Sequence, residues 1–167
     1  MIISDDLFFK SKRLSYRHLN DSDASDEYVS WFKEKNVRRF IQGSEEFTKK
    51  ASLRDYIRGH NSKEDSILLG VFKGLDHIGN IKYEPIDFKE KVAWLGILIG
   101  NESNRSKGFG GEIIESTSLL MKNKLNIKKL KLGVNINNVA AQKSYKKIGF
   151  KIVEKKVGSY ILQLNLT

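Results

Sequence analysis

Apolar and polar side chains alternate in the first part of the chain. Across residues 12–19, Leu14, Tyr16 and His18 share one side, while Arg13 and Arg17 fall on the other. A period of two is the pattern of a strand that buries one face and leaves the other near water. The pattern therefore predicts a half-buried first strand.

The spacing of apolar positions then changes to that of helices. The polar turn 20–23 would cap a first helix, which carries Trp31 and Phe32 and ends near Asn36. We expect both aromatic rings to belong to the core. Thr48 would cap a second helix that extends to residue 59.

The remaining chain reads as strands and helices in alternation. Pro85 lacks a backbone N–H, so pairing should end there. Strands are predicted at 66–72, 77–84, 92–99, 128–134, 150–157 and 160–166, and helices at 112–125 and 138–149. The order is βααβββαβαββ. Hairpins combined with strand–helix–strand crossovers indicate an α/β (α+β) fold with a mixed central sheet and flanking helices, in one domain over residues 1–167.

The stretch from residue 92 to 125 carries the clearest chemistry. An apolar run at 92–99, typical of a strand buried on both faces, leads to a turn that contains Gly108, Gly110 and Gly111 and then to an amphipathic helix. Glycines let a ligand approach the backbone, and the N–H groups and dipole of a helix N-terminus attract anions. Arg105 and Lys107 add positive charge. The stretch therefore predicts a phosphate or pyrophosphate site.

Two common phosphate motifs do not fit this turn. A dinucleotide fingerprint would need glycine where Ile113 stands. A P-loop fails because the Gly74–Gly79 spacing is followed by Asn80. What remains is Arg105-x-x-Gly108-x-Gly110, which resembles the acyl-CoA pyrophosphate loop of the GNAT superfamily of N-acyltransferases. The alternative is an ordinary turn between a strand and a helix.

A second stretch strengthens the resemblance. Asn138 opens a helix, Tyr145 lies seven residues further on, and Gly149-Phe150 closes it, as in the other signature of that superfamily. By local chemistry either Asn137 or Asn138 can cap this helix. The two motifs stand in the expected order, and the element order is that of the GNAT fold. The segment 26–32 resembles the ribosomal-protein N-terminal and amino-sugar acetyltransferase branches.

The resemblance implies roles for individual residues. The end of the strand at 97–99 would offer backbone groups to the pantetheine arm of acetyl-CoA, and N–H groups from Arg105 to Gly111 would hold its pyrophosphate. Asn138 would contact the cofactor beside the thioester, and Tyr145 would protonate the departing thiolate. A buried structural tyrosine is the alternative for Tyr145. The implied cofactor-binding residues are Ile97, Leu98, Ile99, Arg105, Ser106, Lys107, Gly108, Phe109, Gly110, Gly111 and Asn138.

No general base can be carried over from the family. Some members have a glutamate where this chain has Trp94, and Glu84 or Asp87 acting through water are the remaining candidates. An amine must be neutral to attack a thioester. At pH 7 about 0.04% of lysine side chains are neutral, whereas about 10% of α-amino groups are neutral. The expected acceptor is therefore a small-molecule amine, an amino sugar that can be nucleotide-linked, or else a protein N-terminus.

Composition narrows the function further. The chain has no cysteine, which excludes disulfides, thiolate metal sites and a cysteine acyl-enzyme, so direct attack in a ternary complex is expected. Three scattered histidines do not suggest a metal. No apolar run is long enough to span a membrane, and no signal peptide is recognisable, so we expect a cytoplasmic protein. We expect it to be a monomer or a homodimer.

The chain is strongly basic. Its net charge is +10, and lysines crowd residues 128–156. This charge would steer polyanionic CoA and an anionic acceptor, or it reflects a solvated surface. A nucleic-acid or ribosome-binding module ranks last because no known motif accompanies the charge. A CoA-binding sensor without catalysis is the remaining alternative.

Overall fold

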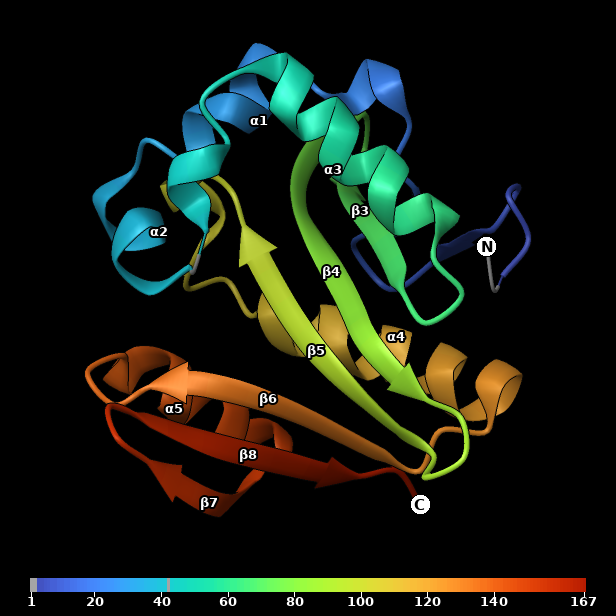
Figure 1. The fold of residues 1–167 in the computed structure, drawn as a ribbon, viewed down its shortest axis with the longest axis vertical. Helices are drawn as coiled ribbons and strands as arrows, with labels where there is room; N and C mark the ends of the chain where they lie inside the picture. The colour runs from blue at the N-terminus through green and yellow to red at the C-terminus, as the bar shows by residue number, and fades with distance from the viewer. Residues whose placement is uncertain (1–2, 42) are drawn as a thin grey trace.

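The computed structural model describes residues 3–41 and 43–167, which form one mixed sheet with helices on both faces (Figure 1). The strand order is β1-β2-β3-β4-β5-β6-β8-β7. Every described neighbouring pair is antiparallel except β5–β6, which is parallel. The strands are β1 (Phe8–Lys10), β2 (Ser15–His18), β3 (Ile67–Lys73), β4 (Asp76–Asp87), β5 (Val92–Ile99), β6 (Lys129–Asn135), β7 (Lys151–Lys156) and β8 (Ser159–Asn165).

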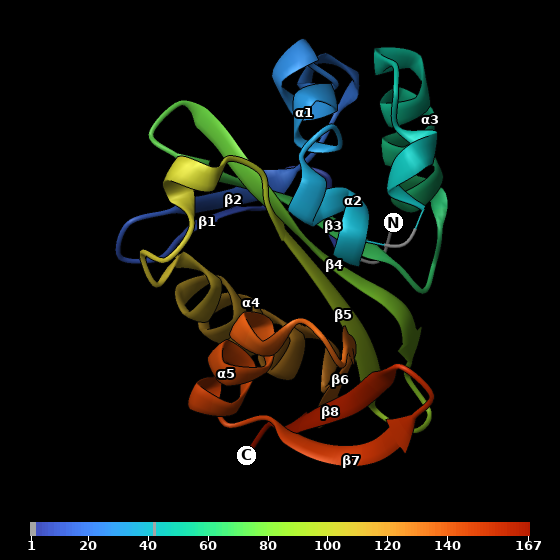
Figure 2. The same cartoon turned by 90° about the vertical axis from the view of Figure 1, so that its left-hand side faces the viewer.

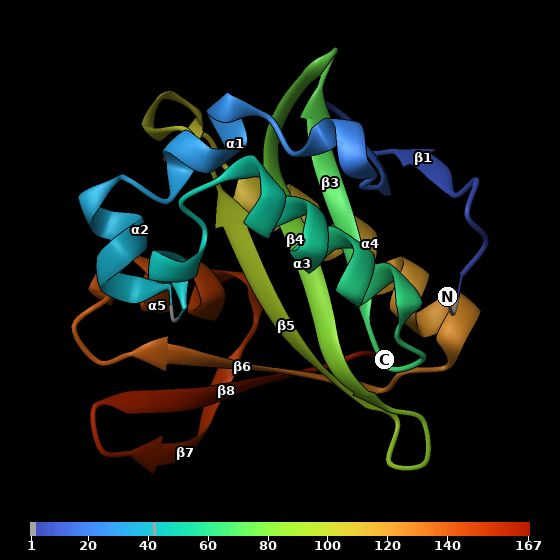
Figure 3. The ribbon, with the colours of Figure 1, turned by 45° about the horizontal axis from the view of Figure 1, so that its top comes forward.

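Helices cover the two faces of the sheet separately (Figure 2). One face packs against a core that includes Ile113 and Met121 of α4, with side chains of α5 beside it. The other face carries a second core built from the first three helices, and Figure 3 shows α3 lying across β3 and β4. The helices are α1 (Asp26–Trp31), α2 (Lys35–Phe40), α3 (Lys50–Ser62), α4 (Phe109–Leu125) and α5 (Val139–Ile148).

The predicted mixed sheet with flanking helices is confirmed, with two additions near the N-terminus. A short strand, β1, precedes the predicted first strand, and the predicted first helix is two helices, α1 and α2. The break follows Phe32, whose N–H bonds back to Val29 and Ser30. Trp31 and Phe32 are buried in the second core, as expected.

Four local predictions were wrong. The N-cap of α1 is Ser25, whose hydroxyl accepts from the Tyr28 N–H, rather than the turn 20–23, where Asn20 caps a short 3-10 helix. The N-cap position of α3 is Lys49, which makes no side-chain cap, rather than Thr48. Pairing of β4 with β5 continues past Pro85, because a register shift lets Ile86 pair with Ala93. Strand β5 is not buried on both faces: Ala93 is buried, whereas Gly96 is exposed.

The exposed face of β5 has a topological cause. Strands β5 and β6 pair over three positions only, and the last pair is Trp94 with Lys131. Beyond it the two strands diverge, as Figure 1 shows, while β4 stays paired with β5 as far as Ile99. A wedge therefore opens in the middle of the sheet, beside the loop that leads into α4. Within the described residues, no helix is long and apolar enough to cross a membrane.

Candidate active site

A cavity of about 700 Å³ lies in the wedge between the diverging strands. Its walls are the second halves of β5 and β6, the start and inner side of α5, the helix α2, and the loop before α4. Elements from the N-terminal, central and C-terminal parts of the chain thus meet around one space. An open parallel pair in an α/β sheet is a common position for a ligand.

The loop before α4 presents free donors at the edge of this cavity, where Ser106 and Gly110 form part of the lining. Ser106 and Gly108 have φ values of 58° and 77°, so the chain turns sharply there. Within the part of the chain that the structure describes, no backbone acceptor receives the N–H groups of residues 106–111. The 17-residue helix α4 starts at Phe109 and directs its positive end the same way. This arrangement is suited to bind a phosphate or pyrophosphate.

Arg105 holds the loop in place. Its guanidinium donates from Nε to the carbonyl oxygen of Ile99 at 3.2 Å and from Nη2 to the same oxygen at 3.0 Å. It also forms an ion pair with Glu34, between α1 and α2, at 2.8 Å. Because these contacts occupy the side chain, the loop is fixed to the end of β5 and to the α1–α2 connection.

A second anchor comes from the β1–β2 turn, and the sequence analysis missed it. Glu112, in the first turn of α4, accepts hydrogen bonds from the Ser11 hydroxyl at 2.6 Å and from the N–H and Nε of Arg13, each at 2.7 Å. Burial would raise the pKa of Glu112, but these hydrogen bonds hold it below its usual value. Arg13 also donates to the Lys107 carbonyl and lies 4.4 Å above the Phe109 ring. No local sequence signal joins residues so far apart.

Tyr145 lies on α5 and lines the cavity. Burial raises the pKa of its hydroxyl to about 12, and the hydroxyl forms no hydrogen bond with any residue that the structure describes. The hydroxyl is therefore protonated at neutral pH and free to donate to a ligand. Its ring packs edge-on against Phe150, with centroids 5.8 Å apart.

The start of α5 is fixed by side-chain amides. Asn138 caps the helix by accepting from the Ala141 N–H at 3.3 Å, as predicted. Gln142 donates to the carbonyl oxygens of Asn135 and Ile136, at 3.1 and 2.9 Å. This glutamine, which the sequence analysis overlooked, ties α5 to the end of β6 and so sets the position of Tyr145.

The structure brings most of the predicted site residues together. Those that line the cavity are Ile97, Leu98, Ile99, Arg105, Ser106, Gly110, Asn138 and Tyr145. Lys107, Gly108, Phe109 and Gly111 are not part of the lining. The Phe109 side chain is 2% exposed and belongs to the core, so only its backbone can face a ligand.

Neither candidate base reaches the cavity. Glu84 forms an ion pair with Lys63, and its Oε2 lies 3.1 Å from Nδ1 of His60, a residue of α3. Asp87 accepts from the Glu90 N–H in the β4–β5 turn. Among the described residues, no aspartate, glutamate or histidine lines the cavity. The part of the chain that the structure describes also contains no cluster of three or more side chains suited to a metal ion.

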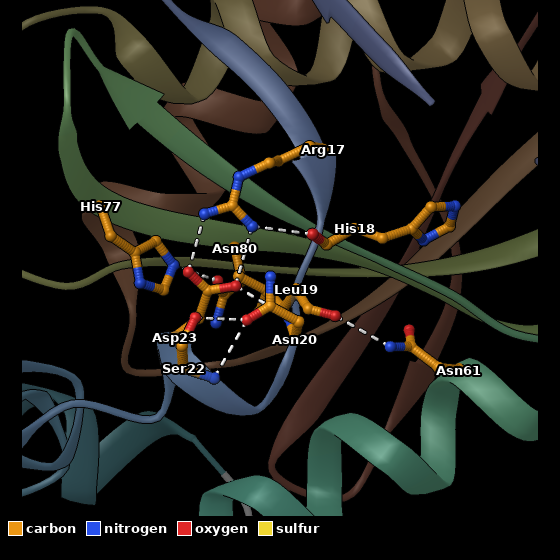
Figure 4. Close-up of polar contacts among 9 residues, drawn as sticks. All are labelled: Arg17, His18, Leu19, Asn20, Ser22, Asp23, Asn61, His77 and Asn80. Carbon is orange, nitrogen blue, oxygen red and sulfur yellow. Dashed lines mark hydrogen bonds and ion pairs between the residues drawn. The ribbon is translucent and has the colours of Figure 1, made fainter. Parts of the chain in front are cut away.

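A polar network fixes the segment before α1 to the sheet (Figure 4). The Arg17 guanidinium donates two 2.8 Å hydrogen bonds to the Asp23 carboxylate. Asn80 bonds to the His77 ring at 2.7 Å and donates to the Tyr28 hydroxyl at 2.6 Å. Because these residues join β2 and β4 to α1, the network fixes the position of α1 on the sheet.

Comparison with known proteins identifies a family. The sequence matches the family model described as "Acetyltransferase (GNAT) domain" over residues 17–161. A comparison of the sequence with curated proteins finds no match.

Solved structures resemble the whole fold. A complex of RimL, a ribosomal L7/L12 alpha-N-protein acetyltransferase, with coenzyme A has 13% identity and a TM-score of 0.81, covering 93% of this chain and 96% of that one. The microcin C7 self-immunity acetyltransferase MccE, with acetyl-CoA and AMP, has 14% identity, a TM-score of 0.80 and coverages of 93% and 94%. A spermidine N-acetyltransferase SpeG chimera from Vibrio cholerae and hSSAT has 19% identity, a TM-score of 0.78 and coverages of 92% and 96%. At these identities the likeness concerns the fold.

Proposed function

The chain belongs to the GNAT acetyltransferase family, and on that premise we propose that it transfers the acetyl group of acetyl-CoA to a primary amine of low pKa, an amino sugar. The neutral amine attacks the thioester carbonyl carbon in a ternary complex. The C–N bond forms, the C–S bond breaks, the Tyr145 hydroxyl gives a proton to the thiolate sulfur, and the product nitrogen loses its proton to water. The Tyr145 oxygen then regains a proton from water, which restores the enzyme.

One observation carries the assignment of the donor. The unpaired N–H groups of residues 106–111 lie where the cavity meets the N-terminus of α4, and a pyrophosphate is the anion that such a row of donors fits. The apolar end of β5 then leads from this loop toward Tyr145, which suits a pantetheine arm. RimL and MccE have been solved with CoA or acetyl-CoA bound.

The lining of the cavity supports an acceptor of low pKa. Its only charged side chains among the described residues are Arg39 and Arg105, so no lining group can serve as a strong base. A polyamine or a lysine side chain would arrive as a cation and would find no carboxylate there. An amine on a sugar ring is less basic because the neighbouring oxygens withdraw electrons, and a larger fraction of it is neutral at pH 7.

A protein N-terminus is the second candidate. Its α-amino group, with a pKa near 8, also meets the requirement for a neutral nucleophile. Ile136 and Val139 are 41% and 53% exposed at the β6–α5 junction beside the cavity, where a peptide could lie. Neither a CoA-binding sensor nor a basic RNA-associated module would transfer an acetyl group to any amine.

Calorimetric titration with acetyl-CoA tests the donor site. We expect a micromolar Kd, about −8 kcal/mol, for the natural protein and no binding for Gly110→Glu, which places a carboxylate against the pyrophosphate. Gly59→Glu is the matched control, because a Cβ at either glycine meets no atom within 4 Å and both changes add one negative charge to a helix. Absence of heat in the natural protein, or equal loss in both variants, would contradict the donor assignment.

Initial-rate kinetics with amino sugars and N-terminal peptides then test the reaction. Intersecting lines in double-reciprocal plots are expected for a ternary complex. Parallel lines would contradict direct attack, and higher kcat/KM for lysine side chains than for amino sugars would contradict the choice of acceptor. Binding of acetyl-CoA without transfer to any amine would favour the sensor.

A further inference from the structure

Two exposed glycines, Gly96 on β5 and Gly133 on β6, stand at the point where the strands diverge. Gly96 stands two positions after Trp94, and Gly133 two positions after Lys131, the last paired residues of the two strands. Because side chains alternate between the faces of a sheet, all four residues share one face. This is the face opposite the core of α4. Both glycines line the cavity.

The packing of the protein does not require these glycines. A Cβ on Gly96 would come no closer than 3.9 Å to Lys82, and one on Gly133 no closer than 3.8 Å to Ile161. Both distances are ordinary contacts, and neither glycine has a left-handed φ. Gly79 is different, because a Cβ there would lie 2.3 Å from the Leu98 carbonyl oxygen.

Glycine inside a strand carries an entropic cost and offers no side chain for packing. A pair of them without a packing reason, facing each other across an open wedge, is typical of a place where another molecule comes close to the backbone. Such a molecule would cross the gap between β5 and β6 from the exposed face of the sheet and reach the cavity. The acceptor is the substrate that would enter from this face, because the loop proposed for the donor leads into α4, which packs against the opposite face of the sheet.

A second hollow of about 390 Å³ adjoins this gap along the same two strands. The half-buried indole of Trp94 forms part of it, two residues or about 7 Å along the strand from Gly96. Asp87 and Glu90 provide acceptors, and Lys129 and Lys131 provide donors. The Lys131 ammonium lies 5.9 Å from the centroid of the Trp94 ring, over one of its faces. An aromatic ring beside balanced donors and acceptors suits a ligand ring that has an apolar side and several hydroxyl groups.

We propose that the acceptor is an amino sugar linked to a second sugar. The ring that carries the amine lies over Gly96 and Gly133 with its nitrogen directed into the cavity, and the second ring lies against Trp94. This assignment rests on the proposed acetyl transfer and adds the size of the acceptor and the residues that select it. Trp94, in the place where some family members carry a glutamate, is then a specificity residue.

The test compares D-glucosamine with its β1,4-linked dimer as acceptors. We expect the dimer to have at least tenfold higher kcat/KM with the natural protein, and Trp94→Ala to bring the two within about threefold. Gly96→Ala and Gly133→Ala should each raise the KM for the dimer at least tenfold while the Kd for acetyl-CoA stays within twofold. Their melting temperatures should be unchanged or higher, since alanine restricts the unfolded chain.

Gly59→Ala on α3 is the matched control. It also adds one methyl group where a Cβ meets nothing within 4 Å, and it should leave the kinetics unchanged. Silent alanine variants at Gly96 and Gly133, or equal kcat/KM for the monomer and the dimer, would overturn the inference while acetyl transfer stood. Failure to bind acetyl-CoA, or to acetylate any amine, would overturn the proposed function and this inference with it.

Discussion

Replacing Tyr145 with phenylalanine separates catalysis from structure at this site. The variant removes one hydroxyl that makes no hydrogen bond to any described residue, and it keeps the ring that packs against Phe150. The fold therefore loses no interaction, and the melting temperature should stay within about 1 °C. The Kd for acetyl-CoA should also be nearly unchanged, because in the proposed mechanism the hydroxyl acts only when charge develops on sulfur.

The raised pKa of Tyr145 sets the size of the expected effect. With its pKa at about 12 and that of a free thiol near 8.5, complete proton transfer to the thiolate would be uphill by about 5 kcal/mol. A thiolate desolvated beside Tyr145 would also be more basic than in water, which reduces this difference. We take the contribution as that of a hydrogen bond to a charged acceptor, about 1.5–3 kcal/mol. This predicts a fall in kcat of about 10- to 150-fold.

Steady-state release of CoA, followed with a thiol reagent, measures the effect. Tyr160→Phe is the control: it removes a hydroxyl from a half-buried tyrosine on β8 that does not line the cavity, and it should leave kcat unchanged. A fall of less than threefold in Tyr145→Phe would refute the reasoning. So would a parallel loss of melting temperature, which would make Tyr145 a structural tyrosine.

Three further predictions concern the pH dependence of the reaction, the Glu112 anchor and the buried tyrosines. Because burial raises the pKa of Tyr145 to about 12, its hydroxyl stays protonated at pH 10. The value of kcat/KM should therefore rise with pH as the amine becomes neutral and should show no fall up to pH 10; a fall centred below pH 9.5 would contradict this. Glu112→Gln should lower the free energy of unfolding in urea by about 1–2 kcal/mol by weakening the bonds to Arg13, and an unchanged midpoint would count against that anchor. Burial raises the pKa values of Tyr28 and Tyr83 in the folded protein. Above pH 10 these tyrosines lose their protons in the unfolded chain before they do in the folded one, so the free energy of unfolding should fall as the pH rises. Melting temperatures from circular dichroism that stay constant from pH 9 to 11.5 would oppose this.

The sequence predicted those parts of the site that depend on local chemistry. Gly108 and Gly110 mark a turn that needs positive φ or close approach, and Asn138 marks a helix start. Such requirements are carried by single residues within one turn of chain, so the pattern identifies them. The apolar run at 92–99 likewise identified β5, the strand beside which the cavity lies.

Long-range contacts escaped prediction for a physical reason. The bonds from Arg13 to Glu112 join positions 99 residues apart, and nothing in either neighbourhood signals the other. Burial of β5 was overestimated because apolarity alone cannot tell a strand covered by protein from one that faces a ligand cavity. The break after Phe32 was missed because the helical spacing of apolar residues continues across it.

The cavity between β5 and β6 is compatible with acetyl transfer although its lining contains no general base. In the proposed reaction the low pKa of the acceptor supplies neutral amine, so the protein needs to exclude water, hold the thioester and provide one proton. Burial of Tyr145 raises the pKa of its hydroxyl to about 12, which keeps that proton available from neutral pH to about pH 10. A carboxylate close to Tyr145 would raise that pKa further and repel the departing thiolate. The apolar and amide lining between Ile97 and Asn138 is therefore consistent with the chemistry proposed for it.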